Sequence, residues 1–139
     1  MKPPDAVQRD IVQQWIAKAT EDMDAAVFLL TQGSRFRGAI GFHSQQAAEK
    51  YLKALLVRHQ IDFAKTHDIE KLVGMLRPAE PGVADVLVEA KWLTPFGVDI
   101  RYPGDVPDIL PGDEERAVEL AGRVREAVMA VLEPYLPMA

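Results

Sequence analysis

Arg37 and His43 have five residues between them and are residue types that could cleave RNA together. A guanidinium can stabilise the charge that develops on a phosphate, and an imidazole can move protons. Six steps along a regular helix turn through about 240°, so the two side chains point about 120° apart. Within one subunit they are poorly placed as a pair. The alternative to catalysis is a solvated arginine and a histidine at the edge of the core.

Four polar residues at helical spacing form a second candidate site: His43, Gln46, Lys50 and Lys53. Residues three or four positions apart lie on the same side of a helix, so these four form a stripe. The stripe is either a solvated helix face or a surface that contacts a phosphate, a nucleotide or a partner protein.

A third candidate lies in a segment rich in proline and glycine, residues 94–112. Arg101 offers a planar, permanently charged group that suits a phosphate or a carboxylate. Tyr102 adds a ring for stacking, and Pro103 restricts the chain beside them. Arg101 could instead hold the loop in place through Asp99 or a helix C-terminus. Long ordered loops are often functional, which keeps the binding interpretation open.

The histidines of the chain do not indicate a metal centre. The three histidines, at positions 43, 59 and 67, lack the four-residue spacing of a helical zinc pair, and the chain has no cysteine. His67 and Asp68 could form a catalytic dyad, but they stand at an expected helix start, where an acidic residue stabilises the helix dipole. We therefore expect no metal and no cofactor.

The residues of the first two candidate sites are positioned by a central helix, expected at residues 36–59. Its apolar residues cover a sector of roughly 200° at 100° per residue. A surface helix needs an apolar stripe little wider than 100°, so this helix should contact several neighbours and bury Leu52, Leu55 and Leu56. Gln45 falls inside the apolar sector. A buried amide needs hydrogen-bond partners, so Gln45 is either a structural pin or part of a site.

Apolar spacing predicts further helices at about residues 10–32, 83–96 and 113–135, and a short one after Thr66, its expected N-cap, that stops before Pro78. No strand pattern is evident. The sequence predicts an all-α, up-and-down bundle of four or five helices, forming a single domain over residues 1–139.

The composition argues against two classes of function, broad RNA binding and membrane insertion. The net charge of −5 argues against a broad surface for RNA. No apolar run reaches the ~18 residues of a membrane span, and the N-terminus has no signal-like segment, so we expect a cytoplasmic protein that does not contact membranes.

Four segments in this order resemble the HEPN family: Trp15 to Met23, FHSQQAAEKYLKALL at residues 42–56, THDIEKL at residues 66–72 and RYP at residues 101–103. The resemblance implies a homodimeric helical bundle. It also implies a nucleotidyltransferase partner, encoded beside many small prokaryotic relatives as the other half of a toxin–antitoxin-like pair. An apolar surplus at Trp92, Phe96 and Tyr102 also favours self-association.

Some family members are metal-independent ribonucleases that use an arginine followed, after four to six residues, by a histidine in the later half of the domain. In this chain no histidine follows His67. The prediction is therefore a non-catalytic module that binds a nucleotide or a partner. Arg101 would contact an anion, Tyr102 would stack, and Lys50 would add a second charge beside His43, Gln46 and Lys53. The alternatives are an endoribonuclease toxin acting through Arg37 and His43, and a purely structural helical protein.

Overall fold

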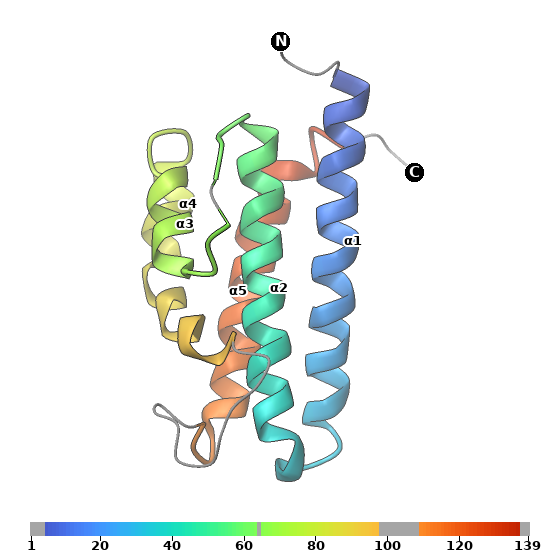
Figure 1. Cartoon of the computed structure of the whole chain (residues 1–139), viewed down its shortest axis with the longest axis vertical. Helices are drawn as coiled ribbons and strands as arrows, with labels where there is room; N and C mark the ends of the chain where they lie inside the picture. Colours follow the sequence, from blue (N-terminus) through green and yellow to red (C-terminus); the bar gives the residue numbers. More distant parts are fainter. Residues whose placement is uncertain (1–4, 64, 98–108, 137–139) are drawn as a thin grey trace.

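In the computed structural model, which describes residues 5–63, 65–97 and 109–136, the chain is a helical bundle (Figure 1). Five α-helices and two 3₁₀ helices follow one another, and the described residues contain no strand. The α-helices are α1 (Asp5–Leu30), α2 (Arg37–Arg58), α3 (Ile69–Leu76), α4 (Pro81–Val86) and α5 (Asp113–Leu132). The 3₁₀ helices are η1 (Ser34–Phe36) and η2 (Val88–Phe96). The predicted all-α bundle is confirmed.

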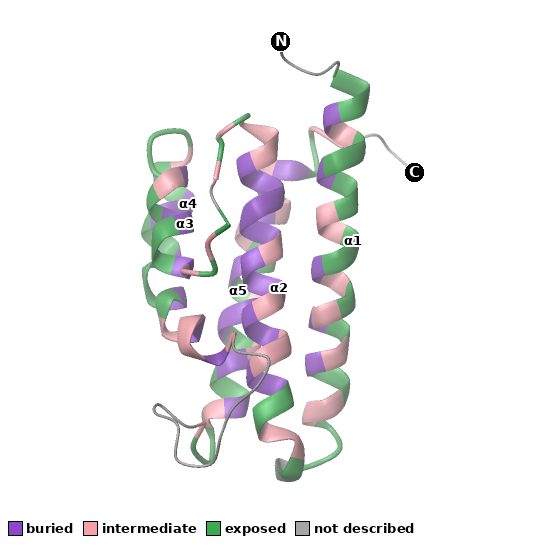
Figure 2. Cartoon of the chain, in the orientation of Figure 1, coloured by how far each residue is buried: buried purple, intermediate pink, exposed green. Residues whose placement is uncertain are grey.

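Helix α2 lies in the middle of the bundle. It packs mainly against α1 and α5, and α3 and η2 cover its remaining side (Figure 1). Helix α1 runs antiparallel to α2, and α5 lies behind α2 in this view. The burial colours show that α2 is the most enclosed of the three (Figure 2). Leu52, Leu55 and Leu56 are all 0% exposed, so the phase predicted for this helix is confirmed.

The helix expected at residues 83–96 is divided in two, which corrects that prediction. Helix α4 ends at Val86, and η2 continues in the tighter 3₁₀ form. Pro95 explains why the last part of this segment cannot be an α-helix. Its ring lacks an N–H and would clash with the carbonyl four residues earlier. A 3₁₀ helix, which bonds over three residues, avoids part of this conflict.

The start of α3 is also different from the expected one. Asp68, not Thr66, is the N-cap: its Oδ1 accepts a hydrogen bond from the Lys71 backbone N–H. Thr66 acts one step earlier, where its Oγ1 accepts from the N–H of Asp68. The first helix also begins earlier than expected, at Asp5. Within the described residues, no helix combines the length and the apolar character needed to cross a bilayer.

Candidate functional site

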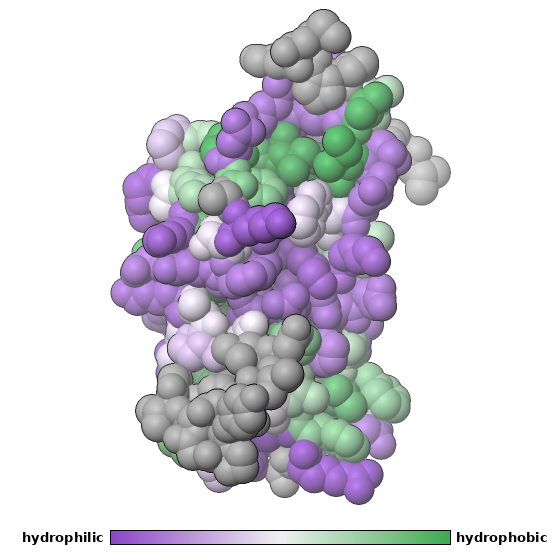
Figure 3. All heavy atoms as spheres, in the orientation of Figure 1, coloured by the Kyte–Doolittle hydropathy of each residue, from purple (hydrophilic) through white to green (hydrophobic). Residues whose placement is uncertain are grey.

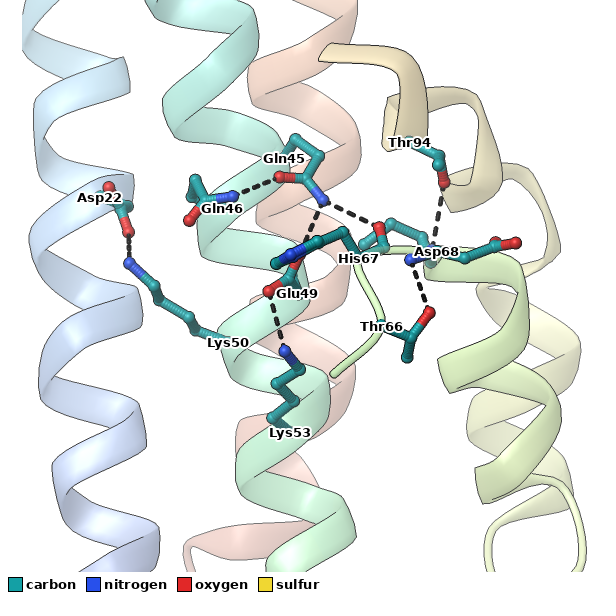
Figure 4. Close-up of polar contacts among 11 residues, drawn as sticks. Asp22, Gln45, Gln46, Glu49, Lys50, Lys53, Thr66, His67, Asp68 and Thr94 are labelled. Carbon is teal, nitrogen blue, oxygen red and sulfur yellow. Dashed lines mark hydrogen bonds and ion pairs between the residues drawn. The ribbon is translucent and has the colours of Figure 1, made fainter. Parts of the chain in front are cut away.

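A band of hydrophilic side chains crosses the middle of the face shown in Figure 3. In the middle of the bundle, a set of hydrogen-bonded residues from α1, α2 and the segment before α3 forms what we call the polar belt: Asp22, His43, Gln45, Gln46, Glu49, Lys50, Lys53 and His67. Figure 4 shows that its side chains extend from α2 in two directions, toward α1 and toward the segment that leads into α3. The polar belt therefore consists of two hydrogen-bonded groups on either side of one helix.

On the α1 side, the carboxylate of Asp22 holds two residues of the predicted stripe. Its Oδ1 lies 2.9 Å from His43 Nδ1, and its Oδ2 accepts a hydrogen bond from Lys50 Nζ. The side chains of His43 and Lys50 remain 31% and 24% exposed. Asp22 thus fixes the direction of both groups and leaves part of each open to solvent.

On the other side, Glu49 is the centre of the hydrogen-bond network. Its carboxylate accepts from Lys53 Nζ at 2.9 Å and from Gln45 Nε2 at 3.1 Å, and His67 Nδ1 lies 3.0 Å away. Burial alone would raise the pKa of Glu49. The hydrogen bonds from Lys53, Gln45 and His67 and the charge of Lys53 outweigh burial, so the pKa lies below its usual value of 4.5. Glu49 is therefore a buried carboxylate that stays ionised.

Lys53 is not part of a solvated face, which corrects one interpretation of the stripe. Its side chain is only 8% exposed, and its ammonium lies 5.7 Å from the Trp15 ring and 5.5 Å from the Phe63 ring. The cause is tertiary, since α1 brings Trp15 and the segment after α2 brings Phe63 over this part of α2. Lys53 can therefore act only from within the core, by orienting other residues of a site, whereas Lys50 and His43 reach the protein surface.

Gln45 is a structural pin within the polar belt. It is 0% exposed, and its Nε2 donates both to Glu49 and to the His67 backbone carbonyl. Its Oε1 accepts from Gln46 Nε2 at 2.7 Å. The amide therefore joins α2 to the segment before α3, and it also positions the Glu49 carboxylate.

His67 pairs with Glu49 across 18 residues of sequence and not with the neighbouring Asp68, which caps α3. Its side chain is 71% exposed. An imidazole held at Nδ1 by a carboxylate keeps Nε2 available for an anion or a proton. Sequence reasoning considered His67 only beside Asp68 and missed its pairing with Glu49, because Glu49 is on another helix and no local spacing reveals the pair.

Arg37 and His43 are held by different carboxylates. Arg37 Nε donates to both oxygens of Glu114, at the start of α5, at 3.0 Å each. The guanidinium keeps the pKa of Glu114 below its usual value. His43 pairs instead with Asp22 on α1. The structure thus gives these two residues separate roles in one subunit and does not bring them together.

Arg101 and Tyr102 lie outside the described residues. The aromatic residues before them are accommodated within the chain: Phe96 is 4% exposed, and the Trp92 ring packs against it at 4.9 Å. Arg116 covers Trp92 at 4.4 Å. Trp92 and Phe96 therefore do not provide the apolar surplus that favoured self-association. Within the described part of the chain, no cluster of three or more metal-ligating residues occurs.

Gly97 lies directly against the side chain of Gln45, which gives a testable prediction. A Cβ at this position would lie 2.5 Å from Gln45 Cδ and still closer to its Oε1. Because Gln45 is buried and bonded at both ends, it cannot move away cheaply. We expect Gly97→Ala to lower the free energy of unfolding by about 1–3 kcal/mol, measured by urea denaturation. The control is Gly74→Ala in α3, where nothing lies within 4 Å of the new Cβ and a gain of up to about 1 kcal/mol is expected. Equal effects of the two changes would contradict this role of Gly97.

Comparison with known proteins identifies one family. Residues 12–133 match the family model of the HEPN domain. Comparisons with curated proteins and with solved structures found no match. The matched region runs from the first half of α1 to the end of α5 and contains the whole polar belt. The chain therefore belongs to the HEPN domain family.

Proposed function

We propose that this HEPN domain is a non-catalytic binding module, the HEPN half of a HEPN–nucleotidyltransferase pair of the toxin–antitoxin-like kind. The observation that carries the proposal is the surface of the polar belt. There Lys50, His43 and His67 are each oriented by a buried or partly buried carboxylate and remain 24%, 31% and 71% exposed. Groups fixed in this way lose little conformational entropy when they bind an anionic group. The ligand would be a nucleotide phosphate or an acidic group of the partner.

The ribonuclease alternative has weaker support. Catalysis by the family's arginine and histidine requires both groups at one phosphate. Arg37 is held by Glu114, whereas His43 is held by Asp22. Catalysis within one subunit would first have to break the Arg37–Glu114 pair, in which both carboxylate oxygens are bonded to the guanidinium.

We further propose a homodimer as the assembled form. Exposed apolar side chains at two separate places, Phe28 at 62% and Val86 at 63%, leave surface that a second copy could cover. Sedimentation that gives a 15.4 kDa monomer at micromolar concentration would contradict this part of the proposal.

The experiment is co-expression with the product of the neighbouring gene, which this proposal expects to be a nucleotidyltransferase, followed by affinity purification and titration with the purified partner. Wild type should retain the partner, and Lys50→Ala should weaken binding at least about tenfold, because a charge-assisted contact contributes about 1.5–3 kcal/mol. Lys71→Ala is the control, since this exposed lysine lies on α3 outside the polar belt.

Two results would overturn the proposal. One is failure of the wild-type chain to bind the nucleotidyltransferase. The other is cleavage of RNA in EDTA by the purified protein that disappears in His43→Ala, which would establish the catalytic alternative.

A further inference from the structure

A groove lies where α1 meets the upper edge of the polar belt. It has a volume of about 390 Å³ and is lined by Ile11, Gln14, Trp15, Lys18 and Lys50. Four of these residues lie along one side of α1 at three- and four-residue spacing, and Lys50 comes from α2. Ile11 and Trp15 supply the apolar wall, and the two lysines supply the charge.

The groove continues into apolar surface. Val7 and Ile11, one turn apart on α1, are 47% and 36% exposed. Ile61 and Phe63, on the segment after α2, are partly buried against the core. Figure 3 shows hydrophobic atoms gathered over the upper parts of α1 and α2, above the hydrophilic band. Exposed apolar surface with a polar rim is typical of a protein-binding site.

Trp15 is a fixed anchor within this surface. Its ring meets Phe63 edge-on at 6.1 Å with an interplanar angle of 72°, and the buried Lys53 ammonium lies 5.7 Å from its centre. Its indole N–H donates to no acceptor in the part of the chain that the structure describes. A half-buried tryptophan that is already held in one orientation is the residue type that most often dominates a binding interface.

The charge of the groove is positive and partly uncompensated. Lys50 is paired with Asp22, but Lys18 has no carboxylate partner among residues 5–63, 65–97 and 109–136. The chain as a whole carries a net charge of −5. Within the described residues neither the Lys18 ammonium nor the Trp15 N–H is bonded to the protein, so both can donate to an acceptor on a partner.

We propose that this groove docks an acidic amphipathic helix of a partner protein. The helix would place apolar side chains on Ile11 and Trp15 and a carboxylate against Lys18. A helix that lays its apolar face into a groove is a common mode of recognition. A second copy of this chain fits less well, because the lining of the groove offers two lysines and no carboxylate, so a two-fold contact centred on it would bring like charges together. The identification of that partner as a nucleotidyltransferase rests on the proposed function, whereas the chemistry of the groove does not.

The first test uses Trp15 as its own reporter. The chain has two tryptophans, so the variant Trp92→Phe leaves the emission of Trp15 alone. The probe is a synthetic amphipathic helical peptide of leucine and glutamate without tryptophan, and the control peptide has lysine in place of each glutamate. The acidic peptide should shift the Trp15 emission with saturation, and the basic peptide should not.

Charge reversal then locates the contact. In the same background, Lys18→Glu should weaken binding of the acidic peptide at least about fivefold, because attraction is replaced by repulsion. Arg125→Glu makes the same change on the exposed surface of α5 and should have no effect. A saturable shift with both peptides alike, or equal affinity in Lys18→Glu and Arg125→Glu, would overturn the proposal.

Two further measurements separate this proposal from other outcomes. If the wild-type chain is a dimer that Ile11→Asp converts to a monomer, the groove is a contact between two copies and the proposal is wrong. If the nucleotidyltransferase binds wild type, Lys18→Glu should weaken that complex as well. If the nucleotidyltransferase does not bind at all, the proposed function fails, and the peptide titration still decides the chemistry of the groove.

Discussion

Replacing Glu49 with alanine should lower the free energy of unfolding by about 3–5 kcal/mol, because it removes one partner of a buried ion pair. The side chains of Glu49 and Lys53 are 5% and 8% exposed. Without the carboxylate, the Lys53 ammonium stays buried near Trp15 and Phe63 with no counter-charge. Gln45 loses an acceptor at the same time. Urea denaturation monitored by circular dichroism at pH 7 measures the change.

A second variant separates loss of the pair from loss of charge balance. When Glu49→Gln is combined with Lys53→Met, no charge remains buried, so the double variant should recover most of the stability. Glu70→Ala is the control, since this glutamate is 67% exposed and its contact with Lys91 is 3.4 Å long. A loss below about 0.5 kcal/mol is expected there. If Glu49→Ala is as mild as Glu70→Ala, the buried pair is not important for the fold.

The same residue predicts how stability responds to acid. The pKa of Glu49 is lower in the folded chain than its ordinary value of 4.5. The unfolded chain therefore binds the proton more readily than the folded chain. The stabilisation is complete above pH 4.5 and is lost as the pH falls through the lower, folded pKa. In Glu49→Gln this part of the acid sensitivity should disappear, which urea denaturation at several pH values between 3 and 7 will show.

The other large effect is expected at the centre of the core. Leu52→Ala should lower the free energy of unfolding by about 2–5 kcal/mol, because it removes buried methyl groups and leaves a cavity. Leu52 is 0% exposed, and α2 contacts every other α-helix of the bundle except α4 closely. Surrounding helices held on several sides can relax little into such a cavity. Thermal and urea denaturation both measure the loss.

Leu110→Ala is the matched control, since it makes the same substitution where the side chain is 62% exposed. A change within about 0.5 kcal/mol is expected there. Similar losses at the two positions would mean that the packing around Leu52 does not limit the stability of the chain.

Much of the fold follows from the sequence because the determining signal is local. The wide apolar sector of residues 36–59 required a helix with several neighbours, and Leu52, Leu55 and Leu56 are buried as that periodicity predicted. Gln45 was identified as a buried amide for the same reason. The order of four segments was sufficient to indicate the HEPN family, which the family comparison confirms. Helix phase and motif order are properties of the chain itself.

The details of the site could be predicted less well from the sequence, because burial of a polar residue depends on what packs over it. Lys50 and Lys53 are three residues apart and belong to the same predicted stripe, yet Lys50 reaches solvent and Lys53 does not. The difference comes from Trp15 and Phe63, which cover Lys53 from other segments. No periodicity within α2 contains that information.

Pairing across elements was likewise decided by the tertiary structure alone. The sequence placed His67 beside Asp68 and suggested Arg37 with His43, since these residues are close along the chain. In the folded chain His67 meets Glu49, Arg37 meets Glu114 and His43 meets Asp22. A charged group pairs with a counter-charge that is close in space, because the attraction between two charges depends on the distance between them and not on their separation along the chain. The sequence by itself thus determined the long helices, the centre of the core and the family, whereas packing of α1, α5 and the segment before α3 around α2 decided which of the polar residues form a site.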